Sequence, residues 1–424
     1  MTENVFRSVY FLLRHDLSIN LFEALIELLD NCNTLIGNQL HAITTARKMA
    51  MSIDELFQSA FVRFLISDKV DEFSQIGDEL TDVGSMKVLL TKLRFFENEW
   101  DLQENVFSIF ESSGTSEQMA DDFVEDFISQ FRVCSSLSRA EVMEILSRKL
   151  ISGGSDRASK ILKFSKLLKN KLSNYIHFKC DNHVTETSWE EVQKVRSVEM
   201  VEETIRSCYG LLKNSASRQL KMTAIAKEFE EKSLKLKGLF DVKFLTSEQS
   251  ANEALLVDYL QLLQLTENLQ SDRNLKRKRK VTIKKLNAKL RDARVLCNAV
   301  ALDSALEEGI APYMLWSQKL EACAFEREFQ KKRLYSKMEV LKQASLLPEE
   351  QKQFLESINY ETKLFQKTNM GVSYCPQNLS EAQAKVIRTR SLICDKFRVT
   401  KERLHKETDP KFLVRLSKAL DCRN

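Results

Sequence analysis

Apolar residues recur at helical spacing along most of the chain. Near the amino terminus, a wide apolar stripe of the kind found on one face of an amphipathic helix consists of Leu21, Phe22, Leu25, Ile26, Leu28 and Leu29. A serine is followed three residues later by glutamate at Ser52–Glu55 and at Ser138–Glu141, which is the form of a capping box. Each of the two capping-box forms predicts the start of a helix. Because 14 of the 25 phenylalanines fall before residue 150, we expect 1–152 to form an acidic, aromatic-rich helical bundle.

The next region, 153–195, combines a basic amphipathic helix with a connector. In residues 156–172, lysine and arginine alternate with apolar residues around Phe164. Most helices with this pattern pack on a core and leave their lysines in water, which is the interpretation that we favour. The alternative is a helix that lies on an anionic membrane surface. Gly153 and Gly154, where the charge balance also changes, are the best candidates for a domain boundary.

From residue 196 the apolar pattern becomes heptad-like, which predicts long coiled-coil helices in 196–310. The seam that we expect consists of Val198, Ile205, Leu212, Phe229, Leu236, Ile283, Leu286 and Leu290. A second long helix is predicted to begin at the capping-box form Ser250–Glu253 and to run to about residue 308. At 1.5 Å per residue it would be roughly 85–90 Å long. Gly309 and Pro312 would end it, and 311–424 would form a C-terminal helical region.

Composition supports the same fold class. The chain contains only 10 Gly and 4 Pro in 424 residues, whereas β-sandwiches, barrels and doubly wound sheets need frequent tight turns. We therefore predict an all-α, elongated protein in which an N-terminal helical bundle is followed by long coiled-coil-like helices.

Charge and cysteine content narrow the cellular compartments in which the protein is expected. Residues 1–150 contain 13 Lys and Arg against 25 Asp and Glu, a net charge of −12, whereas residues 151–424 carry a net charge of +16. Nine cysteines without a C-x-x-C pair indicate reduced thiols. No apolar run approaches the ~18 residues that span a bilayer, and the first residues lack the basic region of a signal peptide. We expect a cytoplasmic or nuclear protein, or both.

The sharpest local feature is a cluster of cations, which we call the basic cluster. It consists of Lys276, Arg277, Lys278, Arg279, Lys280, Lys284 and Lys285. Such a run can bind phosphates through counterion release, or act as a nuclear-import signal. The competing interpretation is a solvated helix face. No aromatic residue interleaves the cluster, so base stacking on single strands is not indicated.

Signals for catalysis or metal binding are weak. His177, Cys180 and His183 have a spacing of three, but a fourth zinc ligand is lacking, so incidental placement is favoured. An acidic cluster from Asp121 to Asp126 is typical of a solvated or docking face. Motifs for nucleotide binding, metalloproteases, hydrolases and kinases are missing. We therefore expect no enzyme, no cofactor, no metal and no small-molecule substrate.

These patterns favour an elongated coiled-coil subunit that scaffolds or tethers a larger assembly of the cytoskeletal, spindle, kinetochore or vesicle-tethering type. Its partners would be proteins bound through helical pairing, in a hetero-complex or a homodimer. Two alternatives use the basic residues instead. One is a BAR-like helical module on anionic membranes, and the other is a helical protein that binds nucleic acid or chromatin through residues 273–294.

Overall fold

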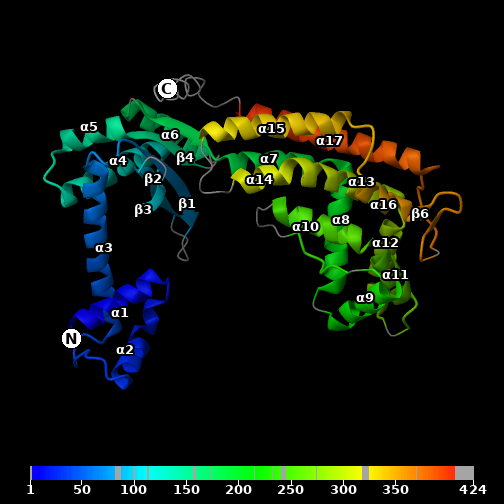
Figure 1. Ribbon diagram of the computed structural model, residues 1–424, viewed down its shortest axis with the longest axis horizontal. Coiled ribbons are helices and arrows are strands. Elements are labelled where there is room, and N and C mark those ends of the chain that lie inside the picture. Colours follow the sequence, from blue (N-terminus) through cyan, green and yellow to red (C-terminus); the bar gives the residue numbers. More distant parts are fainter. Residues whose placement is uncertain are drawn as a thin grey trace. The chain divides into compact units, whose positions relative to one another are not determined.

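The computed structural model describes residues 2–81, 87–98, 101–111, 114–155, 159–172, 174–213, 215–231, 233–239, 245–273, 275–317, 324–368 and 370–405 (Figure 1). The chain divides into two compact units, Met1–Lys179 and Cys180–Asn424. Each unit is described by itself.

The first unit begins with a small helical cluster. It is formed by α1 (Thr2–Arg14), a 3₁₀ turn (Ile19–Leu21), α2 (Phe22–Asn31) and the first half of α3 (Ile43–Ile66). α3 runs on from this cluster to the sheet (Figure 1). Ala46 and Met49 therefore pack in the small helical core, whereas Val62 and Leu65 pack in a second core under the sheet.

The sheet of the first unit has five strands in the order β3-β2-β1-β4-β5. β1 (Phe73–Thr81), β2 (Lys87–Asn98) and β3 (Asp101–Glu111) form an antiparallel meander. β4 (Leu150–Ser155) pairs in parallel with β1, and β5 (Ile176–Lys179) pairs in parallel with β4. Parallel neighbours need crossover connections, and the helices between the strands supply them.

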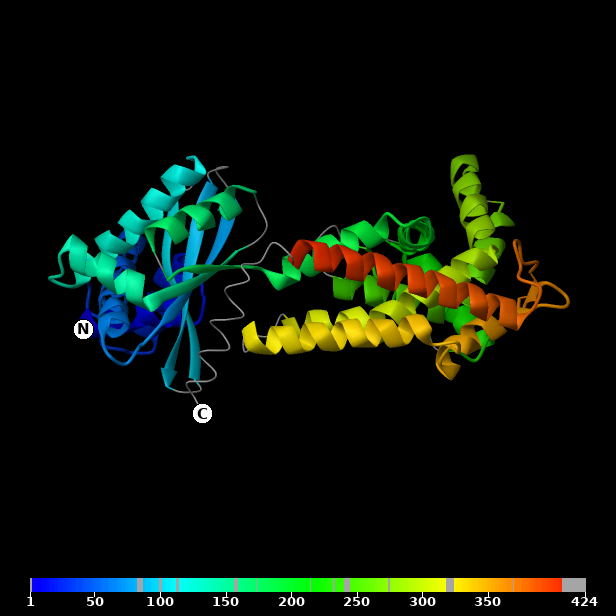
Figure 2. The same ribbon diagram turned by 90° about the horizontal axis from the view of Figure 1, so that it is seen from above.

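Helices α4 (Ser116–Cys134), α5 (Arg139–Lys149) and α6 (Ser159–Lys171) lie over one face of this sheet (Figures 1 and 2). Their apolar sides meet the strands in an aromatic core. The rings of Phe107 and Phe127 stack with centroids 4.2 Å apart, and Phe164 meets Phe123 edge to face at 5.6 Å. The aromatic-rich composition of this region thus builds a helix-on-sheet core.

The predicted all-α fold class is wrong, because the first unit contains this sheet. In β2, Leu89, Thr91, Leu93 and Phe95 are buried and the residues between them are more exposed, which is the two-residue period of a strand. Low glycine and proline counts do not exclude such a sheet. A three-stranded meander needs only two tight connections, and the remaining strands are linked by helices.

The second unit consists almost entirely of helices. They are α7 (Asp181–Gln193), α8 (Arg196–Leu212), α9 (Ala216–Glu228), α10 (Leu245–Val257), α11 (Tyr259–Gln270), α12 (Arg277–Leu290), α13 (Ala293–Ala305), α14 (Ala311–Ser317), α15 (Ala324–Gln343), α16 (Glu349–Glu356) and α17 (Leu379–His405). A short hairpin of β6 (Ile358–Asn359) and β7 (Leu364–Phe365) lies between α16 and α17.

α13 is the centre of the second unit. Every residue of this helix except Arg294 is buried, and α8, α10, α16 and α17 pack around it. A helix that is apolar on nearly all sides is expected only inside a core. The second unit therefore has a core of its own.

The predicted long coiled-coil helices are not formed. The stretch 251–308 is divided among α10, α11, α12 and α13, and Ser250–Glu253 lies inside α10. A π-helical turn (Leu306–Ile310) leads directly into α14, so Gly309 and Pro312 do not end the helical path. Ser52–Glu55 likewise lies inside α3, which begins after Ala42. No helix of the described residues is both long and apolar enough to cross a bilayer.

Candidate functional site: a groove along α3

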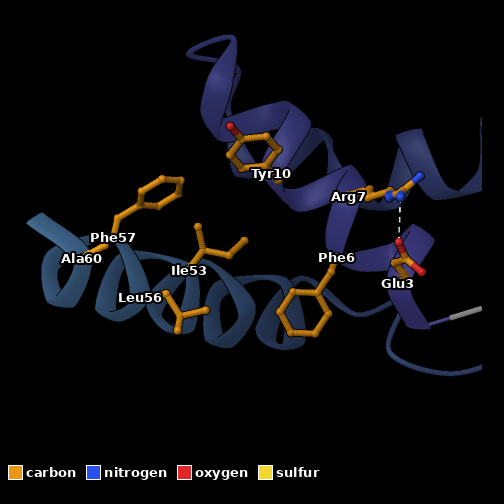
Figure 3. Close-up of a pocket in the computed structure, with 8 residues that line it drawn as sticks. All are labelled: Glu3, Phe6, Arg7, Tyr10, Ile53, Leu56, Phe57 and Ala60. Atoms are coloured by element: carbon orange, nitrogen blue, oxygen red, sulfur yellow. Dashed lines mark ion pairs between the residues drawn. The ribbon is translucent and has the colours of Figure 1, made fainter.

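An apolar groove opens between α1 and α3 (Figure 3). It has a volume of about 450 Å³ and is lined by Glu3, Phe6, Arg7, Tyr10, Ile53, Leu56, Phe57 and Ala60. The rings of Tyr10 and Phe57 stack across it, with centroids 6.2 Å apart and planes inclined by 18°. Glu3 and Arg7 form an ion pair of 2.7 Å along α1. The groove is therefore lined mainly by apolar side chains, and its two charged residues, Glu3 and Arg7 on α1, neutralise each other.

The groove exists because α1 has more apolar surface than its core can bury. Val5, Val9 and Leu12 point into the small helical core, whereas Phe6 and Tyr10 each follow a core residue by one position and remain exposed. A step of one residue turns about a quarter of the way round a helix. The second apolar stripe therefore faces the groove.

A second hollow of about 510 Å³ continues the groove toward the sheet. It is lined by Asp54, Phe57, Gln58, Ala60, Phe61 and Phe64 of α3, Phe95 and Glu97 of β2, and Gln103, Asn105 and Val106 of β3. Phe57 and Ala60 line both hollows. One groove thus follows α3 from Ile53 to Phe64, a length of about 17 Å at 1.5 Å per residue.

Polar groups around the second hollow are acceptors without partners. Asp54 and Glu97 form no ion pair with any residue that the structure describes. The side-chain oxygen Oε1 of Gln58 is buried and accepts no hydrogen bond from the described chain. No lysine or arginine lines this hollow. The groove therefore offers the unpaired negative charge of two carboxylates beside apolar surface.

The sequence-predicted seam residues lie in the core of the second unit. Those buried there are Val198, Ile205, Leu212, Leu236, Ile283, Leu286 and Leu290, and Phe229 is half-buried against the same core. Their side chains pack against neighbours in the same chain. They do not form an exposed seam for a second chain.

The basic cluster lies at the start of α12. Lys276 is its N-cap, and Arg277, Lys278, Arg279, Lys284 and Lys285 are exposed, while Lys280 is half-buried. The structure therefore keeps six of these seven cations on the surface and brings them onto one helix.

The basic helix of 156–172 corresponds to α6, which packs against α4. Lys163 pairs with Glu117 at 2.6 Å, and Lys171 pairs with Asp121 at 2.6 Å. Glu125 of the acidic cluster binds Arg139. One ion pair, Lys171 with Asp121, thus joins the basic helix to the acidic cluster, and α5 supplies the partner of Glu125.

Metal binding finds no geometric support in the described residues. They contain no group of three or more His, Cys, Asp or Glu side chains arranged to hold a metal ion. His177 belongs to β5, whereas Cys180 precedes α7 and His183 lies within it. The spacing of three in the sequence is therefore divided between two elements.

A buried polar cluster in the second unit was not predicted from the sequence. Lys401 is fully buried, and its Nζ donates to Thr185 Oγ1 (2.6 Å) and to Asp181 Oδ1 (3.3 Å). Tyr313 also donates to Asp181, and its ring lies 4.6 Å from the ammonium. These contacts tie α7, α14 and α17 together, so we interpret the cluster as structural. A single lysine in an amphipathic helix gave no signal for it.

The groove residues were also not predicted from the sequence. Leu56 and Phe57 continue an apolar helical pattern that is indistinguishable from a core-facing stripe. Only the structure shows that nothing in the described part of the first unit covers them.

Comparison of the chain with models of protein families, with curated proteins and with solved structures found no match.

Proposed function

We propose that this chain is a non-enzymatic interaction subunit that binds a basic amphipathic helix of a partner protein in the groove along α3. The observation that carries the proposal is the exposed apolar groove with two unpaired carboxylates, Asp54 and Glu97, in its second hollow. Leu56 and Phe57 keep 71% and 57% of their surfaces exposed. Contiguous apolar patches of this kind mark interaction sites.

The dimensions of the groove suit a helical ligand. A length of about 17 Å accommodates three turns of helix, and partner helices in such grooves are anchored by apolar residues at positions i, i+3, i+4 and i+7. Each apolar anchor that becomes fully buried contributes about 1.5–3 kcal/mol before the costs of association. A few anchors are enough for a stable complex.

The charge of the groove selects a basic partner. Asp54 and Glu97 lack ion-pair partners among the described residues, and Gln58 Oε1 lacks a donor. Lysine or arginine on the flank of a bound helix would pair with both carboxylates. Complementary charge of this kind contributes to specificity and to the rate of association.

A pair of designed peptides tests the proposal. The probe is a fluorescent 18-residue helix with leucines at i, i+3, i+4 and i+7 spacing and lysines elsewhere, and its partner carries glutamate at every lysine position. We expect the basic peptide to bind and the acidic peptide not to bind. Failure of both peptides, or tighter binding of the acidic one, contradicts the proposal.

Two leucines provide a matched pair of variants. Leu56 and Leu220 are both 71% exposed, but Leu220 lies on α9 of the second unit. Leu56→Asp should weaken binding of the basic peptide at least ~10-fold, since a buried carboxylate replaces an apolar anchor, whereas Leu220→Asp should leave it unchanged. Equal losses in both variants would refute a groove-specific site.

Charge reversal adds an independent readout. Asp54→Lys combined with Glu97→Lys should weaken the basic peptide and strengthen the acidic one. If a second copy of this chain occupies the groove instead, light scattering will show a dimer that Leu56→Asp dissociates.

The seven cysteines that the structure describes are all free, which supports cytoplasm or nucleus as the setting for this interaction.

A further inference from the structure

The amino-terminal half of α12 projects from the second unit. Residues 276–282 are exposed, apart from half-buried Lys280. The later part of the helix anchors it, since Ile283, Leu286 and Leu290 are buried in the core. α12 packs beside α11 (Figure 1). α12 thus presents an exposed basic segment whose later residues are anchored in a folded core.

The cations of this segment remain unpaired within the part of the chain that the structure describes. None of the seven residues of the basic cluster forms an ion pair with any described residue. The neighbouring Lys289, by contrast, is paired with Glu203 at 2.9 Å. Cations in the first turn of a helix also oppose the helix dipole. An external polyanion would relieve both sources of repulsion.

We propose that the exposed face of α12 binds duplex DNA through its phosphates, without reading base sequence. This activity is separate from the groove, because it uses the second unit. An α-helix with its side chains is about 10–12 Å wide and fits the major groove of B-form DNA, which is ~12 Å wide. Lysine and arginine on its two flanks then reach the phosphates of both strands.

The surroundings of the cluster favour DNA over a membrane. A helix that inserts at a membrane surface must bury its apolar face in lipid, but the apolar face of α12 is already buried in the protein core. Val281 is the only exposed large apolar residue of this helix. Aromatic side chains are absent from residues 276–290, so single strands are not the favoured ligand either.

Fluorescence anisotropy with a labelled 20-base-pair duplex of arbitrary sequence tests the proposal. We compare the full chain with a quadruple variant of the cluster, Lys278→Gln, Arg279→Gln, Lys284→Gln and Lys285→Gln. A matched control neutralises four exposed cations of the first unit, Arg14→Gln, Lys48→Gln, Lys69→Gln and Arg132→Gln, which also lack ion pairs among described residues.

The salt dependence carries the decisive result. Each phosphate contact contributes about −0.9 to the slope of log K against log salt concentration. We expect the cluster variant to reduce the magnitude of the slope by about 2 to 4 and to weaken binding at 50 mM salt at least ~10-fold. The control and the Leu56→Asp variant should bind as the unmodified chain does.

Three outcomes would overturn this inference. They are no duplex binding at 50 mM salt, an equal loss in the control variant, and binding to vesicles containing phosphatidylserine without binding to the duplex. Because Leu56→Asp affects only the groove, failure of DNA binding is distinguishable from failure of the proposed peptide site.

Discussion

Lys149 shows how one charged side chain can hold two elements of the first unit together. It is the last residue of α5, and its buried Nζ donates to the backbone oxygens of Leu65 (3.1 Å), Ile66 (3.2 Å), Ser67 (2.7 Å) and Val70 (2.6 Å). These oxygens lie at and beyond the carboxyl end of α3, where helix carbonyls lack partners and positive charge is favoured. The lysine therefore fixes the exit of α3.

Lys149→Met should destabilise the first unit by about 2–4 kcal/mol, because buried carbonyl groups lose charged donors. Arg148→Met is the control, since Arg148 is the exposed neighbour on the same helix. Hydrogen exchange of the amides near residues 62–70 measures the effect. Equal protection in the two variants would show that the lysine contributes no more than its exposed neighbour.

Two buried carboxyl groups make the second unit sensitive to pH. Glu248 accepts hydrogen bonds from Trp189 Nε1 and from Gln193 Nε2, and burial together with neighbouring Glu202 raises the pKa of Glu248 to about 8. Burial also raises the pKa of Glu202, although Arg206 opposes this shift. The native pair thus retains a proton that the unfolded chain has already lost at neutral pH.

The sign of the pH effect follows from this proton. Between about pH 4.5 and pH 8 the native state binds more protons than the unfolded state, so stability falls as pH rises. Asp258 and Asp303 act in the same direction, since burial raises their pKa values to about 6 and about 7. We expect the second unit to be more stable at pH 5.5 than at pH 8.5.

Glu248→Gln should remove the share of this dependence that comes from Glu248, while Asp258 and Asp303 keep theirs. An amide cannot ionise, so the variant should match the unmodified chain near pH 5.5 and exceed it at pH 8.5 by on the order of 3 kcal/mol. Thermal unfolding followed by tryptophan fluorescence measures the difference, because Trp189 contacts the residue. Parallel pH profiles of the two proteins would contradict the assignment of the proton to this pair.

At the scale of elements, the contact between α6 and α4 allows ion pairs and apolar packing to be compared. Its lysines pair with α4 at exposed positions, where ion pairs contribute little. Phe164 is buried against Phe123. We expect Phe164→Ala to destabilise the first unit by about 3–5 kcal/mol and Lys163→Gln with Lys171→Gln to change it only slightly. Urea unfolding compares the two, and a larger effect of the lysine variant would reverse this interpretation.

Helix ends were partly predictable from local sequence, because a capping box uses only neighbouring residues. Ser138 and Glu141 form one as expected. Thr115 and Gln118 form another that was not predicted. Ser52–Glu55 has the same form but lies inside α3, because the apolar positions on both sides extend the helix through it.

The sheet and the groove could not be predicted from such local sequence signals. β2 has a two-residue period in Leu89, Leu93 and Phe95, but the neighbouring Val88 and Leu90 are also apolar, so the sequence alone does not mark this segment as a strand. The groove depends on which apolar face of α1 and α3 stays uncovered, and this is decided by tertiary packing. The heptad-like spacing in 196–310 fits helices buried among neighbours of their own chain as well as it fits a coiled coil.

At the scale of the whole molecule, the difference in net charge between the two parts of the chain is smaller when charges are summed over each structural unit. Residues 1–179 carry 20 Lys and Arg against 26 Asp and Glu, whereas residues 180–424 carry 44 against 34. The basic α6 belongs to the acidic unit and neutralises part of it. The remaining excess of positive charge lies in the unit that contains the basic cluster, which agrees with the proposed DNA binding.

Each unit has its own hydrophobic core among the residues that the structure describes. Units of this size bury enough apolar surface to fold alone. We therefore expect fragments 1–179 and 180–424 to unfold cooperatively in separate calorimetric transitions. In the full chain, Phe164→Ala should lower only the transition of the first unit. Glu248→Gln at pH 8.5 should raise only that of the second. A single transition that both variants shift together would mean that the two units fold as one cooperative structure, and the groove and the basic helix would then have to be studied in the intact chain.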